Sequence, residues 1–121
     1  MKNPLKPLST YAFNLIVKII SKKQLILFSD FIVKELKVKY DILEIEELFT
    51  LISNSGFLKK VEITKEDFEE ADKLADERNV AFGDALHAIL ARNHNAILIT
   101  RDAHFNELKD IVEVKKPEEV I

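Results

Sequence analysis

The sequence predicts an α/β fold in which a short, mainly parallel sheet is covered by helices on both faces. Short apolar runs typical of buried strands alternate with longer segments whose apolar residues recur at helical spacing. Such alternation favours parallel pairing, because each helix carries the chain back to the start of the next strand. The 121 residues are 47% hydrophobic and 32% charged, enough apolar material for a packed core. We therefore expect one domain over residues 1–121.

Helix signals define the first half of the chain. Ser9 and Thr10 can cap a helix after a start that two prolines interrupt. Asp41 can open a later helix, which Gly56 ends as a plausible C-cap. The run QLILF is most simply a buried parallel strand. The predicted helices here are 10–22, 31–40 (capped by Ser29 or Asp30) and 41–56, and the predicted strands are 24–28 and 57–63.

The second half begins with another capped helix. Thr64 can cap residues 65–78, whose expected buried stripe includes Phe68 and Leu74. The following helix is apolar almost all round, and AILIT after it is a third strand. The remaining predictions are a helix over 82–95, a strand over 96–100, a helical turn over 103–108, a strand over 111–114 and a last turn from Pro117.

Composition excludes several classes of function. The chain has no cysteine, so disulfides, thiolate zinc sites and a cysteine nucleophile are ruled out. The net charge of −3 does not favour nucleic-acid binding by bulk electrostatics. Any contact with nucleic acid must come from metal ions held by carboxylates or from local clusters of lysines. The lysines of this chain are better explained as the solvated faces of helices. The start of the chain has no signal peptide, no apolar run could span a bilayer, and we expect a cytoplasmic protein.

Two acidic residues on predicted helices are candidates for chemistry. Glu35 has Phe31, Ile32 and Val38 as neighbours on the helical wheel, and a carboxylate on such an apolar face is costly unless it is paired. The alternative is a Glu at the edge of the stripe that pairs with a nearby lysine. Asp84 opens the segment GDALHAILA, whose small residues allow close approach of other elements. Its alternative role is an N-cap or first-turn residue that satisfies backbone amides and the helix dipole.

A third candidate stands at the end of a predicted strand. Asp102 follows AILIT, and ligands of open parallel sheets bind beyond the carboxyl ends of the strands. The alternative is a cap for the turn that contains His104 and Phe105. If Glu35, Asp84 and Asp102 converge, they form an acidic site suited to Mg²⁺ or Mn²⁺. Sequence spacing alone does not show that they converge.

These residues resemble a known family. The stretch GDALHAILARNHNAILITRDAHFNEL is similar to the C-terminal half of PIN domains, including VapC-type toxins, through its Asp-Ala-Leu helix start, its Thr-x-Asp strand end and the following Phe. SDFIVKEL resembles the helix of that family that bears a metal-site Glu, which is Glu35 here. VEVKKPEEVI resembles the closing strand and the end of the domain. The resemblance covers roughly residues 24–121.

The resemblance implies a PIN-like three-layer α/β/α fold and a metal-dependent ribonuclease that cleaves single-stranded RNA. Mg²⁺ or Mn²⁺ would be held by Glu35, Asp84 and Asp102, directly or through water. Thr100 would support the site or contact the substrate. A toxin with an antitoxin partner is one expected role, and an inactive module that binds protein or RNA is the alternative. A response-regulator-like domain is less favoured, because no acid pair follows a first strand.

Two departures from the family pattern stand out. Many members carry a second acid where this chain has His104, which could contact a phosphate, titrate near neutrality or simply lie on the surface. The family also begins with a central strand that ends in Asp, and residues 1–7 do not resemble it. We therefore expect a fold without its first strand, from an internal start or a degenerate homologue. Unpaired strand edges would favour a homodimer, with strand exchange as one route.

Overall fold

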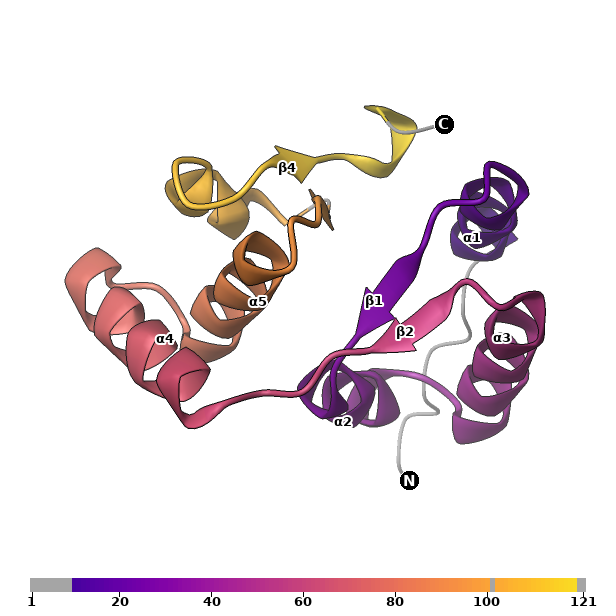
Figure 1. Cartoon of the computed structure of the whole chain (residues 1–121), viewed down its shortest axis with the longest axis horizontal. Coiled ribbons are helices and arrows are strands. Elements are labelled where there is room, and N and C mark those ends of the chain that lie inside the picture. The colour runs from indigo at the N-terminus through magenta and orange to yellow at the C-terminus, as the bar shows by residue number, and fades with distance from the viewer. Residues whose placement is uncertain (1–9, 101, 120–121) are drawn as a thin grey trace, which may run out of the picture. The chain divides into compact units, whose positions relative to one another are not determined.

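The computed structural model describes residues 10–100 and 102–119 as a mixed α/β chain (Figure 1). Contacts divide the chain into two compact units, which meet in sequence between Glu62 and Ile63. We describe each unit by itself, and the expected single domain stays a prediction. The predicted irregular start and the absent first strand lie outside the described residues, as does Ser9. None of the helices in the described ranges is long and apolar enough to cross a membrane.

Over residues 10–62, the described part of the first unit contains three helices and one parallel strand pair. Ser29 caps α2 by accepting a hydrogen bond from the Ile32 N–H at 3.3 Å. Asp41 caps α3 in the same way through the Leu43 N–H at 2.9 Å. Gly56 ends α3 with a φ of 81°, which glycine adopts without strain. The elements are α1 Thr10–Ser21, β1 Ile26–Phe28, α2 Asp30–Lys39, α3 Ile42–Ser55 and β2 Leu58–Lys60.

Parallel pairing is confirmed in this unit. β1 pairs with β2 so that Ile26 lies opposite Leu58. The Val61 N–H extends the ladder by donating to the Phe28 carbonyl at 2.8 Å. Phe28 also meets Phe49 of α3 edge to face, with ring centroids 5.2 Å apart, which fixes the strand pair against that helix.

In the second unit, the described residues 63–100 and 102–119 form two helices, a second parallel strand pair and two 3₁₀ turns. Its core includes Leu86, Ile89 and Leu108, the largest side chains that are fully buried among the described residues. β3 pairs with β4, with Leu98 opposite Val114. The elements are α4 Lys65–Arg78, α5 Phe82–Asn93, β3 Leu98–Ile99, η1 Ala103–Leu108, β4 Val114–Lys115 and η2 Pro117–Glu119.

Expectations about the last strand and about two apolar side chains need correction. The last strand begins at Val114 rather than Ile111, because the Ile111 and Val112 N–H groups both donate to the Leu108 carbonyl and close a turn. Phe68 is not buried: it is 45% exposed and stacks on Phe82, with ring centroids 5.8 Å apart. Val38, expected beside Glu35 on an apolar face, is 72% exposed.

The start of α4 is tied to the end of α5 through a buried carboxylate that sequence analysis did not single out. Thr64 and Asp67 form a reciprocal capping box, with hydrogen bonds of 2.9 and 3.1 Å. The Asn93 side-chain amide donates to the Asp67 carboxylate at 2.9 Å. Burial raises the pKa of Asp67, but the hydrogen bonds from Thr64 and Asn93 outweigh burial and hold the pKa below its ordinary value.

Asp67→Asn is expected to lower the free energy of unfolding by about 1–2 kcal/mol at pH 7, because it weakens the cap and removes a buried ionic acceptor. A carboxyl whose pKa is lowered in the folded protein stabilises it above the unfolded pKa of about 4. This stabilisation is lost as pH falls through the folded pKa. The deficit of the variant should therefore shrink at about pH 3, as measured by urea unfolding. Asp72→Asn, an exposed change on the same helix, is the control, and an equal deficit at both pH values would contradict the assignment.

Candidate metal centre

Three side chains of the second unit form the candidate site. Asp84, Asp102 and His104 each place one potential ligand atom so that all three atoms lie within 4.8 Å of one another. Asp84 is half-buried, whereas the other two are exposed. The structure therefore brings together two of the three predicted acids and adds the histidine that follows them.

Asp84 is held by the start of α5. The N-cap of this helix is Ala81, so the expectation that Asp84 is itself the cap is wrong, whereas its alternative place in the first turn is confirmed. A carboxylate in the first turn is stabilised by the positive end of the helix dipole. Ala85, directly after Asp84, and Ala88, one turn further on, are fully buried, and this anchors the helix that carries Asp84.

Asp102 is held by local hydrogen bonds beyond the carboxyl end of β3. The Thr100 N–H donates to the Lys115 carbonyl at 3.0 Å, which extends the strand ladder to Thr100. The Asp102 N–H then donates to Thr100 Oγ1 at 3.0 Å. Asp102 Oδ1 accepts from the His104 N–H at 2.9 Å, so the alternative role of Asp102, a cap for the following turn, is confirmed. Asp102 is thus oriented from both sides.

His104 lies at the exposed edge of the cluster. Its side chain is 80% exposed, in agreement with the surface position that was one of the expectations. Its Nδ1 is nevertheless 3.1 Å from Asp102 Oδ1, so the ring lies on the side of the acidic pair. A contact of His104 or Thr100 with substrate stays a prediction.

Glu35, the third predicted acid, lies on α2 in the first unit. It is half-buried, as are Phe31 and Ile32. The face of α2 that carries Glu35 is less apolar than expected, because the Val38 side chain is exposed to solvent. Its role as a metal ligand stays a prediction from the resemblance.

The donor set of the cluster fits a divalent cation. Two carboxylates this close repel each other unless positive charge or hydrogen-bond donors compensate. Two atoms bound to one ion at ~2.1 Å lie ~3 Å apart when adjacent and ~4.2 Å apart when opposite. The 4.8 Å limit on the Asp84, Asp102 and His104 atoms is only slightly wider than such a coordination sphere. Carboxylate oxygens suit Mg²⁺ and Mn²⁺, and an imidazole nitrogen suits transition metals.

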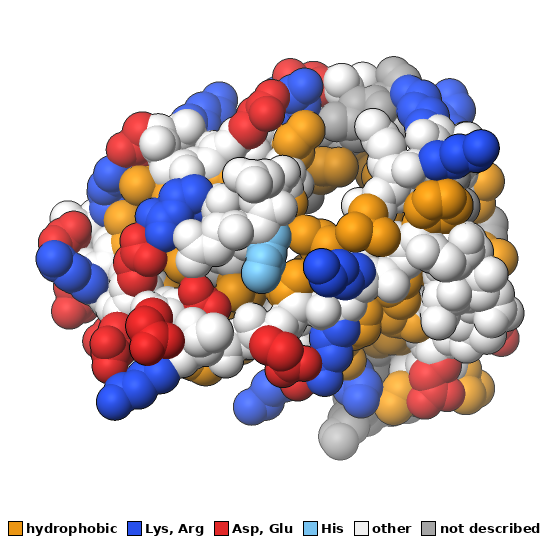
Figure 2. Space-filling model, viewed as in Figure 1, with side chains coloured by type: hydrophobic (Ala, Val, Ile, Leu, Met, Phe, Trp, Pro, Cys, Tyr) orange, Lys and Arg blue, Asp and Glu red, His pale blue; other side chains and the backbone are white. Residues whose placement is uncertain are grey.

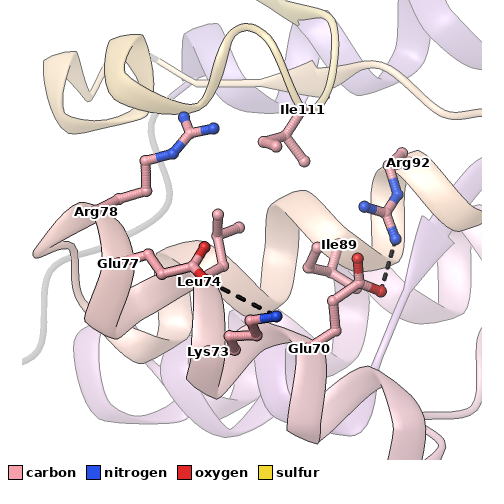
Figure 3. A pocket seen from close by; sticks show the side chains of 8 residues that line it. All are labelled: Glu70, Lys73, Leu74, Glu77, Arg78, Ile89, Arg92 and Ile111. Atoms are coloured by element: carbon pink, nitrogen blue, oxygen red, sulfur yellow. Dashed lines mark hydrogen bonds and ion pairs between the residues drawn. The ribbon is translucent and has the colours of Figure 1, made fainter.

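A separate hollow in this unit is lined by α4, α5 and Ile111 (Figure 3). Its two arginines are already engaged: Arg92 donates to Glu70 at 2.7 Å, and Arg78 makes two bonds to Asp110 at 2.7 and 2.6 Å. The hydrogen bond from Arg92 lowers the pKa of Glu70. Acidic and basic side chains are also interspersed over α4 (Figure 2). The arginines of this hollow are therefore not available to bind an anionic ligand, and the acidic cluster is the better candidate site.

Comparison with known proteins identifies the family of the chain. The family model of the PIN domain matches residues 12–111, a segment that runs through both units and contains all the candidate residues. No curated protein matches the chain. PIN domains generally have nuclease or RNA-related functions and are typically dependent on divalent metal. Since the family model covers more than half of the chain, the protein belongs to the PIN domain family.

Proposed function

We propose that this protein is a metal-dependent endoribonuclease that cleaves single-stranded RNA, with Mg²⁺ or Mn²⁺ held by Asp84 and Asp102. The observation that carries the proposal is the approach of the ligand atoms of Asp84, Asp102 and His104 to within 4.8 Å. It joins the start of α5 to the end of β3, two places that sequence alone could not connect. The role of Glu35 as a further ligand rests on the family resemblance.

The residues around the cluster provide positioning and charge. Asp84 is fixed by a buried helix, and Asp102 is fixed by Thr100 and by its cap on η1. Preorganised carboxylates lose little freedom on binding a cation. A bound divalent ion would polarise a phosphate oxygen and activate a water molecule for hydrolysis. Thr100, close to Asp102, is the proposed contact for the RNA backbone.

The proposal is tested with labelled single-stranded RNA, incubated with Mg²⁺, with Mn²⁺ or with a chelator. Cleavage is expected only with a divalent ion, and it should disappear in Asp84→Asn. The matched control is Asp76→Asn, which neutralises an exposed acid on α4 and should leave cleavage unchanged. Failure of the folded wild-type protein to cleave RNA with either ion would refute the nuclease proposal for this chain.

A non-catalytic PIN-like module that binds RNA or protein is the second candidate. The exposure of the Asp102 and His104 side chains, 47% and 80%, favours it, because exposed ligands hold a cation weakly. Calorimetry separates the two candidates. Stoichiometric Mn²⁺ binding at neutral pH supports the nuclease, whereas RNA binding without any Mn²⁺ binding supports the module.

Three finer proposals concern biological context. We propose a cytoplasmic toxin of a toxin–antitoxin pair, an antitoxin protein as its partner, and a homodimer as its assembly state. The toxin and antitoxin proposals follow from the resemblance to VapC-type toxins, and the homodimer proposal follows from the expected unpaired strand edges. Light scattering of the purified protein, alone and after co-expression with the product of a neighbouring gene, tests the dimer and the partner.

A further inference from the structure

We propose that His104 is a nitrogen ligand of the metal centre and that the site therefore favours transition-metal ions such as Mn²⁺, Co²⁺ or Zn²⁺ over Mg²⁺. The inference rests on the proposed function, because it concerns the same metal site. It assigns His104 to the metal rather than to the RNA phosphate.

The distance between His104 and Asp102 is the first argument. Nδ1 of the imidazole lies 3.1 Å from Asp102 Oδ1. Two ligand atoms at ~2.0–2.2 Å from one ion are ~2.8–3.6 Å apart at right or tetrahedral angles. The observed pair therefore already has the separation of two neighbouring ligands. Asp84 supplies a third ligand atom within 4.8 Å of both.

The backbone around His104 is the second argument, because it keeps the ring beside Asp102. The His104 N–H donates to Asp102 Oδ1 at 2.9 Å, and the Phe105 N–H donates to the Asp102 carbonyl at 3.2 Å. Phe105 itself is only 6% exposed and anchors the turn in the core. The position of the imidazole thus follows from a buried anchor and a capped turn, although the ring itself is open to solvent.

The chemistry of the donors is the third argument. Mg²⁺ prefers oxygen ligands, whereas imidazole suits zinc, copper, iron and nickel. Affinity for nitrogen-containing sites also rises from Mn²⁺ through Co²⁺ to the later metals of the row. A site with two carboxylates and one imidazole should therefore discriminate against Mg²⁺ more strongly than a site made of carboxylates alone.

The test is metal binding by the RNA-free, folded protein, so that it does not depend on cleavage. Calorimetry with Co²⁺, Zn²⁺, Mn²⁺ and Mg²⁺ compares the wild type with His104→Ala and His104→Asp. His104→Ala should weaken Co²⁺ and Zn²⁺ binding by about 10-fold or more, with little effect on Mg²⁺. His104→Asp should strengthen Mg²⁺ binding relative to Co²⁺. The visible absorption of bound Co²⁺ should change in both variants.

His94→Ala is the matched control, since His94 is an exposed histidine outside the cluster. Unchanged Co²⁺ affinity and spectrum in His104→Ala, with metal binding still lost in Asp84→Asn, would overturn this inference and leave the nuclease proposal standing. Loss of RNA affinity without loss of metal affinity would also overturn it and assign His104 to the phosphate. If the wild-type protein binds none of the four ions, both the proposed His104 ligand and the proposed metal-dependent nuclease are refuted.

Discussion

Asp102→Asn is expected to lower divalent-dependent RNA cleavage by about 100-fold or more while the protein stays folded. Asparagine caps a helical turn about as well as aspartate, so the hydrogen bond from the His104 N–H can persist. The charge that binds the cation is lost, and even residues that merely orient metal ligands cost about 10–100-fold when they are replaced. Initial rates on single-stranded RNA at saturating Mn²⁺ provide the measurement, with circular dichroism as the check of folding.

A second substitution separates the two roles of Asp102. Asp102→Ala removes both the charge and the cap, so it should be as inactive as Asp102→Asn and also less stable by about 1 kcal/mol. If capping were the sole role of Asp102, the asparagine variant would keep near wild-type activity. Full activity of the folded Asp102→Asn variant would therefore contradict the assignment of Asp102 as a metal ligand.

The helices were predictable from sequence because their ends are encoded locally. The caps Asp41 and Thr64 and the C-cap Gly56 lie where the sequence indicated, and each acts through neighbours within a few residues. The strands were less predictable. The strand expected over 24–28 is confined to Ile26–Phe28, because only these residues find partners in β2. Strand length depends on a distant partner, which no local pattern specifies.

The candidate site shows the same division between local and distant signals. Asp84 and Asp102 could be singled out because each follows a recognisable local pattern, a helix start and a strand end. Their approach to each other could be seen only in the tertiary structure, as could the participation of His104.

The buried Asp67 was not predicted from the sequence for a related reason. Thr64 and Asp67 have the spacing of a capping box, but the bond from Asn93 joins positions 26 residues apart.

Leu86→Ala is expected to have the largest effect on stability, lowering the free energy of unfolding by about 3 kcal/mol. Leu86 is 0% exposed on α5, directly after the equally buried Ala85 and two residues after Asp84. Truncation leaves a cavity and removes apolar contacts that the surrounding core cannot fully restore. Because the total stability of a small protein is about 5–15 kcal/mol, this is a large fraction. Urea unfolding followed by circular dichroism measures it.

The same chemical change at the surface isolates the effect of burial. Leu43 is 65% exposed, so Leu43→Ala should change the free energy of unfolding by no more than about 0.5 kcal/mol. The loss in Leu86→Ala should also loosen the start of α5, because Asp84 lies only two residues before the cavity. Mn²⁺ binding by this variant should therefore weaken under conditions in which it remains folded. Equal losses of stability in the two leucine variants would show that Leu86 does not occupy the packed core described for α5.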